Sequence, residues 1–246
     1  MPVIDVEVIE DSVSFEKEGK EPTKPEETEF YEPVVPIVKK DENGIPSDAI
    51  VLFNGGSLDQ WENAKNQTEA KWQLNVDGSM TVKDKTGDIQ TKQKFGDVQL
   101  HIEWRSPKEI GGKGQHRANS GIFLSEKYEV QVLDNNENST YVNGQVGSIY
   151  KQHTPLAMAS VASGEWNAYD IIYHAPEFDE AGLKIKPGTL TVIHNGILIQ
   201  DHVEIKGTTP YIGWPKNPPH GKGSLLLQDH GDSSRVSFRN IWVREL

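Results

Sequence analysis

Residues 119–134, NSGIFLSEKYEVQVLD, contain two short runs of alternating apolar residues separated by a polar corner. If both runs are β-strands, Tyr128, Val130 and Val132 point to one face of a sheet and Glu129 and Gln131 to the other. One face of this strand would then pack in a core. The opposite face would present a carboxylate beside an amide.

Alternating patterns continue on both sides of this stretch. In residues 98–106, VQLHIEWRS, the apolar positions share one face, and His101, Glu103 and Arg105 share the other. Residues 166–174, WNAYDIIYH, predict another long strand. Residues 190–201, LTVIHNGILIQD, predict a hairpin around Asn-Gly, with His194 exposed at the turn and uninvolved in function. Residues 147–150 predict a short strand, and the chain closes with two strands, LLLQD and VSFRNIWVREL.

These elements indicate an all-β fold. Roughly a dozen short strands at spacings of about 8 to 15 residues, with no convincing amphipathic helix, are typical of a β-sandwich or jelly roll. We therefore expect two antiparallel sheets, one of which presents a concave polar face.

The net charge of −12 belongs mainly to the N-terminal segment. Residues 1–47 hold 13 acidic and 5 basic residues, which leaves 24 acidic and 20 basic residues in 48–246. We expect an acidic, Pro- and Glu-rich arm over 1–47 and a sandwich domain over 48–246. Neither part has the basic stripe of a nucleic-acid-binding protein or the apolar run of a membrane span.

Nine motifs together resemble one family: LFNGGSLDQWE (52–62), FGDVQLHIEWR (95–105), NSGIFL (119–124), YEVQVLD (128–134), GSIY (147–150), GEWNAYDIIY (164–173), VIHNGILIQD (192–201), LLLQDHG (225–231) and SFRNIWVREL (237–246). In this order they are similar to the 3-keto-disaccharide hydrolases, which have a concanavalin A-like glucanase sandwich. The resemblance implies cleavage of glycosides oxidised at C3. It also implies export to the periplasm or the extracellular space, although the N-terminus lacks a signal-peptide pattern.

The implied chemistry starts from the acidity that a C3 ketone gives to the C2 proton. Removal of this proton forms an enolate, which expels the glycosidic oxygen from C1, and water then adds back. This route needs a base near C2, a hydrogen-bonding group at the C3 oxygen and an acid at the leaving oxygen.

We expect Glu129 to be the base, with His230 as acid, base or metal ligand. Glu103 would join them only if its strand is a neighbour; otherwise it forms an exposed ion pair. The residues expected to bind the sugar are Gln131, Arg105, Asn119, Ser120, Gln228, Trp166, Tyr150 and Lys151. For the aromatic members, a place in the core is the competing interpretation.

Two other functions fit the same residues. A conventional glycoside hydrolase would use Glu129 and Glu103 as a carboxylate pair. A non-catalytic carbohydrate-binding domain would lack a buried carboxylate with a shifted pKa. No metal motif is present, and DNNEN at 134–138 lacks the closing glutamate of an EF-hand, but a divalent cation would suit the ketone chemistry. With no cysteine, thiolate metal sites are excluded, and nothing indicates an oligomeric state.

Overall fold

The computed structural model describes residues 21–246, so part of the arm predicted over 1–47 lies outside the described residues. Contacts divide the chain into two units, Met1–Val38 and Lys39–Leu246. The regular structure described in the first unit is one 3₁₀ turn, η1 (Pro25–Glu27). Within residues 21–246, no helix is both long and apolar enough to cross a membrane.

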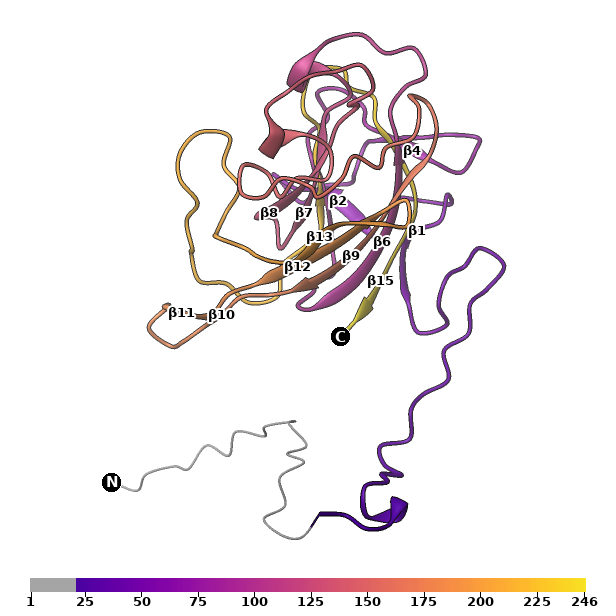
Figure 1. Cartoon of the computed structure of the whole chain (residues 1–246). Coiled ribbons are helices and arrows are strands. Elements are labelled where there is room, and N and C mark those ends of the chain that lie inside the picture. The colour runs from indigo at the N-terminus through magenta and orange to yellow at the C-terminus, as the bar shows by residue number, and fades with distance from the viewer. Residues whose placement is uncertain (1–20) are drawn as a thin grey trace. The chain divides into compact units, whose positions relative to one another are not determined.

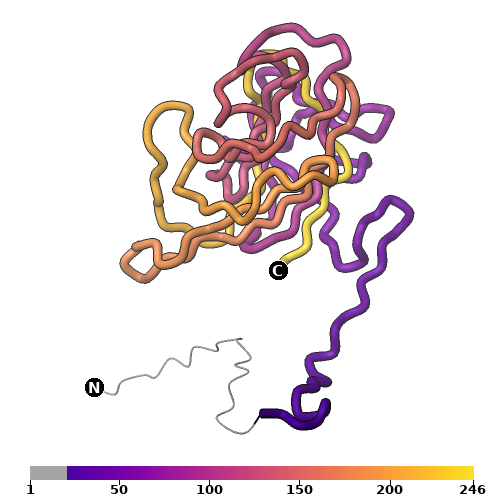
Figure 2. The backbone as a smooth tube through the Cα atoms, in the orientation of Figure 1, coloured from indigo at the N-terminus to yellow at the C-terminus, as the bar shows by residue number. Residues whose placement is uncertain are grey.

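The second unit is an all-β sandwich of antiparallel sheets, which confirms the predicted fold class (Figures 1 and 2). The eight-stranded sheet has the order β13-β12-β9-β6-β15-β4-β3, with β1 also paired to β15. Its strands are β1 (Ile50–Phe53), β3 (Gln73–Leu74), β4 (Met80–Thr81), β6 (Val98–Arg105), β9 (Asn167–His174), β12 (Thr189–His194), β13 (Ile197–Glu204) and β15 (Ser237–Glu245).

The five-stranded sheet has the order β2-β5-β14-β7-β8. Its strands are β2 (Trp61–Asn63), β5 (Ile89–Thr91), β7 (Ser120–Leu124), β8 (Tyr128–Val132) and β14 (Leu226–Leu227). A separate hairpin joins β10 (Glu177–Phe178) to β11 (Lys184–Lys186), and two further 3₁₀ turns, η2 (Gly114–His116) and η3 (Val142–Gly144), lie in loops.

The core lies between the two sheets. Every second residue of β6 is buried, as its alternation predicts, and Tyr128, Val130 and Val132 of β8 belong to the same hydrophobic cluster. Polar atoms also join the layers, because the Tyr169 hydroxyl of β9 donates to the Gln131 carbonyl of β8 at 3.0 Å. The position of β8 over the larger sheet is thereby fixed.

The Asn-Gly hairpin forms as predicted between β12 and β13. Asn195 and Gly196 have φ angles of 51° and 80°, the left-handed values that a type I′ turn requires. The expectation for His194 is wrong, because it is the last inward residue of β12 and is fully buried. Its Nε2 lies 2.9 Å from Asn167 Oδ1, and burial lowers its pKa to about 4.

Residues 147–150 do not form the predicted regular strand. Only Ile149 makes isolated bridges, to Val130 of β8 and to His153. The backbone of this stretch turns sharply, with Gly147 at a φ of 77°, and so it pairs with β8 at single points instead of along a ladder.

The outward face of the eight-stranded sheet carries a network of charges around Glu103. A bulge in β15 directs Arg239 and Asn240 to the same carboxylate, at 2.6 and 2.9 Å. Beside Glu103, His101 lies 2.7 Å from Asp170. Burial alone would lower the pKa of His101, but these two carboxylates outweigh burial and raise it to about 9.

This network makes stability depend on pH. Because the folded pKa of His101 exceeds the unfolded value of 6.5, its contribution is fully present below pH 6.5 and is lost as the pH rises through 9. In urea unfolding, we expect His101→Gln to cost roughly 1–2 kcal/mol more at pH 6 than at pH 10, allowing for solvent screening. An equal cost at both pH values would contradict the assigned charge on His101.

Candidate active site

A covered pocket lies on the outward face of the five-stranded sheet. Loops bury this side of β8, so that Glu129 is 5% exposed and Gln131 only 1%. The pocket has a volume of about 390 Å³, including its open mouth. Its lining residues are Gln115, Asn119, Phe123, Glu129, Gln131, Tyr150, Thr209, Tyr211, Gln228 and His230.

The pairing of three strands determines which side chains meet in this pocket. In β7 and β8, Gly121 is opposite Gln131 and Phe123 is opposite Glu129. Beyond β7, the backbone N–H of Gln228 donates to the Gly121 carbonyl at 3.1 Å, and the Gln228 side chain lines the same pocket. A Cβ at Gly121 would lie 2.5 Å from Glu129 Oε1, so any larger residue there would displace the carboxyl group.

The free edge of β8 is covered by residues 147–150. The Gly147 N–H donates to the Gln131 carbonyl at 3.0 Å, and the Tyr150 N–H donates to the Glu129 carbonyl at the same distance. These bonds place the Tyr150 side chain in the pocket wall, where its hydroxyl lies 2.6 Å from that of Tyr141. Burial raises the pKa of Tyr150 well above its usual value, so the hydroxyl stays protonated.

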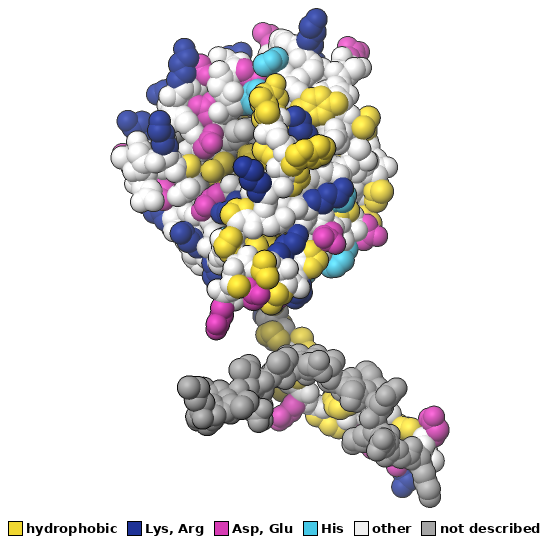
Figure 3. Space-filling model, turned by 90° about the vertical axis from the view of Figure 1, so that its left-hand side faces the viewer, with side chains coloured by type: hydrophobic (Ala, Val, Ile, Leu, Met, Phe, Trp, Pro, Cys, Tyr) yellow, Lys and Arg dark blue, Asp and Glu magenta, His cyan; other side chains and the backbone are white. Residues whose placement is uncertain are grey.

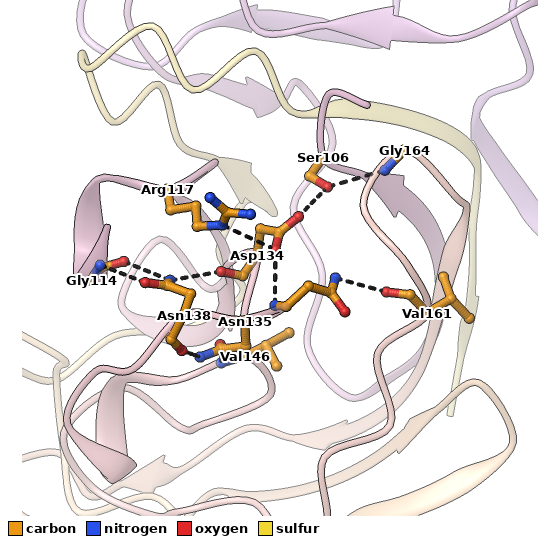
Figure 4. Close-up of polar contacts among 10 residues, drawn as sticks. Ser106, Gly114, Arg117, Asp134, Asn135, Asn138, Val146, Val161 and Gly164 are labelled. Atoms are coloured by element: carbon orange, nitrogen blue, oxygen red, sulfur yellow. Dashed lines mark hydrogen bonds and ion pairs between the residues drawn. The ribbon is translucent and has the colours of Figure 1, made fainter. Parts of the chain in front are cut away.

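A polar network holds the loop that carries Gln115 and Arg117 (Figure 4). Asn138 binds both backbone groups of Gly114, accepting from its N–H at 2.6 Å and donating to its carbonyl at 3.0 Å. Asp134 accepts from Ser106 at 2.6 Å and forms an ion pair with Arg117 at 3.5 Å. Polar side chains in 134–138 thus bind protein groups and fix the loop.

Glu129 is the unusual group in the pocket. Among the described residues, no hydrogen-bond donor reaches its carboxyl oxygens. Burial raises its pKa to about 8, and the charge of Asp88 adds to this shift. A carboxyl group held in this state can exchange a proton near neutral pH.

Amide side chains surround Glu129 and leave two acceptors unused. Gln131 Nε2 donates to Gln115 at 3.1 Å and to Asn119 at 3.3 Å. Its own Oε1, and that of Gln228, are buried without a hydrogen-bond partner among residues 21–246. An unpaired buried acceptor costs about 1–3 kcal/mol, so a ligand with hydroxyl donors would recover this free energy.

His230 also lines the pocket. Its Nδ1 lies 2.8 Å from Asp232 Oδ2, and this contact orients the imidazole ring. A histidine oriented by a carboxylate can act as an acid or a base, as in many catalytic sites.

Beside the pocket, an exposed loop follows β13. Lys151 Nζ donates to the Tyr211 carbonyl at 2.5 Å and lies 4.8 Å from the centre of the Tyr211 ring. Further along, Trp214 is 87% exposed and lines an adjoining cavity with Tyr150 and Lys151. Figure 3 views this side of the molecule, where hydrophobic and basic side chains mix.

The structure brings together six of the predicted residues and keeps five out of the pocket. Glu129, Gln131, Asn119, Gln228, Tyr150 and His230 line it. Ser120 lies under the sheet surface and donates to the Gln228 carbonyl at 2.8 Å, and Lys151 lines the adjoining cavity.

Glu103 and Arg105 lie on β6 of the other sheet, and Trp166 directly precedes β9 of that sheet. Glu103 is expected to join Glu129 only if their strands are neighbours. They are not, because β6 pairs with β9 and β15 and not with β8. Trp166 is held between Arg105 and Arg239, whose guanidinium carbons lie 4.4 and 4.2 Å from the ring centre. These three side chains therefore do not line the pocket that holds Glu129.

Four residues that line the pocket are not predicted from the sequence: Gln115, Phe123, Thr209 and Tyr211. Phe123 shares a face with Gly121 in an alternating strand, so its direction could have been read from the pattern. Gln115, Thr209 and Tyr211 reach the pocket from irregular loops, and no periodic pattern indicates their position.

The fold and the pocket together define a β-sandwich protein with a covered polar site on one sheet. The chain belongs to the family of the 3-keto-alpha-glucoside-1,2-lyase-like domain, whose model matches residues 48–244. This match confirms the resemblance drawn from the motifs.

Solved structures agree with this assignment. A "putative glycosyl hydrolase" from Parabacteroides distasonis ATCC 8503 is 54% identical, with a TM-score of 0.88 over 93% of this chain and 99% of that chain. Two others of the same description and organism are 22% and 23% identical, with TM-scores of 0.59 and 0.55. They cover 81% and 80% of this chain, and 94% and 99% of their own, and they share the fold. No curated protein matches the chain.

The close approach of Gly121 to Glu129 can be tested by substitution. We expect Gly121→Ala to lower the free energy of unfolding by roughly 1–3 kcal/mol, because the added methyl group overpacks against the carboxyl group and the Phe123 ring. Gly221→Ala is the control, since a Cβ there would meet nothing within 4 Å. Equal urea midpoints for the two variants would contradict the tight packing beside Glu129.

Proposed function

We propose that this protein cleaves 3-keto-glycosides, including 3-keto-disaccharides, by proton abstraction at C2, elimination at C1 and rehydration. The observation that carries the proposal is Glu129, a buried carboxyl group without a protein donor whose pKa is raised to about 8. The family assignment supports the substrate class. We further propose that the protein acts outside the cytoplasm, since the family resemblance implies export.

The reaction begins when ionised Glu129 takes the proton from C2. The electron pair left on C2 delocalises onto the C3 oxygen as an enolate. Collapse of the enolate forms a C1–C2 double bond and breaks the bond from C1 to the glycosidic oxygen, which leaves with the electron pair and takes up a proton. Water then adds its hydroxyl to C1, C2 recovers the proton held by Glu129, and the second water proton restores the acid.

The raised pKa suits Glu129 to this role. A base is most effective when its pKa approaches that of the proton it removes, yet it must still ionise at the working pH. A carboxylate with an ordinary pKa is a weak base towards a C–H bond, and burial strengthens it. At pH 7, about a tenth of the molecules carry the ionised form when the pKa is near 8.

The groups around Glu129 can perform the remaining tasks. The unused oxygens of Gln131 and Gln228 would accept hydrogen bonds from sugar hydroxyls. Tyr150, which stays protonated, and His230 are the candidates for the acid at the leaving oxygen. Both line the same pocket as Glu129.

The carboxylate pair of a conventional glycosidase finds less support. Burial alone would raise the pKa of Glu103, but on the other sheet His101, Asn240 and Arg239 outweigh burial and lower it to about 2. It therefore stays ionised and cannot serve as an acid for a sugar bound near Glu129. The route through a C3 ketone requires one carboxylate at the reacting carbon.

A comparison of two substrates tests the reaction. The purified chain is incubated with a 3-keto-disaccharide and with the unoxidised parent sugar, and the products are followed by mass spectrometry. We expect cleavage of the oxidised sugar alone, with exchange of the C2 proton for deuterium in heavy water. Cleavage of the parent would indicate ordinary hydrolysis, and binding without turnover would indicate a carbohydrate-binding domain.

The role of Glu129 predicts a pH profile. We expect kcat/KM to rise about tenfold per pH unit and to level off near pH 8, where the carboxyl group ionises. Glu129→Gln should lower kcat by about 10²- to 10⁴-fold, with an unchanged far-ultraviolet circular dichroism spectrum. Glu62→Gln, on β2 of the same sheet, is the matched control and should keep the wild-type rate. A fully active Glu129→Gln variant would remove the base assignment.

A further inference from the structure

At the edge of the pocket, two imidazoles and a carboxylate converge. Asp232 Oδ2 lies 2.8 Å from His230 Nδ1 and 3.7 Å from His116 Nδ1. One ligand atom from each of these residues lies within 4.8 Å of the other two, and within residues 21–246 this is the one such group of His, Asp and Glu side chains.

The three residues come from loops whose backbone is held in place. His116 ends η2, whose first residue, Gly114, is bound on both sides by Asn138 (Figure 4). Gly112 passes so close that a Cβ there would lie 1.8 Å from the His116 carbonyl oxygen. On the other loop, Asp229 Oδ1 accepts from the Gly231 N–H at 3.0 Å, which shapes the turn between His230 and Asp232.

Asp232 also has an unused oxygen. The Asp232 side chain is only 16% exposed. Its Oδ1 is buried and has no hydrogen-bond partner among the described residues. A carboxylate oxygen in such a position costs free energy unless a cation or a donor satisfies it. The imidazole of His116 is largely exposed.

We propose that His116, His230 and Asp232 bind a divalent transition-metal ion. Atoms that bind one Zn²⁺ at about 2.0–2.2 Å lie about 3.3 Å apart, so the observed spacing needs only small rotations of the side chains. Two imidazoles and one carboxylate favour Zn²⁺ or Co²⁺ over Mg²⁺ or Ca²⁺, which take mainly oxygen ligands. Three protein ligands leave a coordination position for water or substrate.

The position of the site suggests its use and rests on the proposed function. His230 lines the pocket that holds Glu129, while His116 and Asp232 line a second cavity of about 640 Å³ on the other side. A bound cation would therefore lie at the boundary of the two spaces. From there it would polarise an oxygen of the substrate, which supplies the positive charge that an enolate needs and that the described pocket lining does not offer.

Metal binding can be measured without any activity. The full chain is stripped with chelator, dialysed and titrated with Zn²⁺ and with Co²⁺ in a calorimeter, and the visible spectrum of bound Co²⁺ reports its coordination. We expect one ion per chain. His116→Ala, His230→Ala and Asp232→Asn should each weaken binding at least tenfold, while His202→Ala, an exposed histidine outside the group, should not.

The outcomes separate this inference from the proposed reaction. Absence of binding, or equal affinity in wild type, His116→Ala and His230→Ala, would overturn the metal site, and so would an anomalous-scattering peak elsewhere in Zn²⁺-soaked crystals. Binding at these residues without cleavage of 3-keto sugars would leave the site standing and remove the proposed function. Cleavage at full rate by a metal-free chain would leave the proposed function standing and overturn the role of the bound ion in the reaction.

Discussion

Strand β8 is buried on both faces, and the rest of the molecule depends on this constraint. Tyr128, Val130 and Val132 fill the core, while Glu129 and Gln131 fill the pocket on the opposite side. A shift of the strand by one residue would exchange the two sets and bury a carboxylate between the sheets. Because burial of a carboxylate in the core costs free energy, the register of β8 is fixed. The register in turn determines the position of the pocket.

The same burial opposes stability at neutral pH. The pocket raises the pKa of Glu129 by removing water and by placing Asp88 nearby, so the ionised form is disfavoured in the folded chain. The unused oxygens of Gln131 and Gln228 add a further penalty. Such groups persist where a ligand satisfies them, which supports the proposal that this face of the sheet binds a ligand.

Local alternation explains how much of the structure could be predicted from the sequence. The pattern of period two correctly assigned β6, β7, β8, β9 and the Asn-Gly hairpin, and it placed Glu129 and Gln131 on a common face. It cannot assign strands to sheets, which depends on the tertiary arrangement, and so it leaves open whether the strand of Glu103 lies beside that of Glu129. Thr209 and Tyr211 enter the pocket from a loop, and their position follows from long-range hydrogen bonds that leave no local pattern.

The exposed loop after β13 gives the molecule an optical property. The chain has six tryptophans, of which four are buried: Trp61, Trp72, Trp104 and Trp242. Trp166 is held between two arginines, and Trp214 projects into water beside the pocket. Its indole therefore emits at longer wavelength than the buried ones and is open to aqueous quenchers. Intrinsic fluorescence at the red edge of the emission band thus reports on this one corner of the protein, without any attached dye.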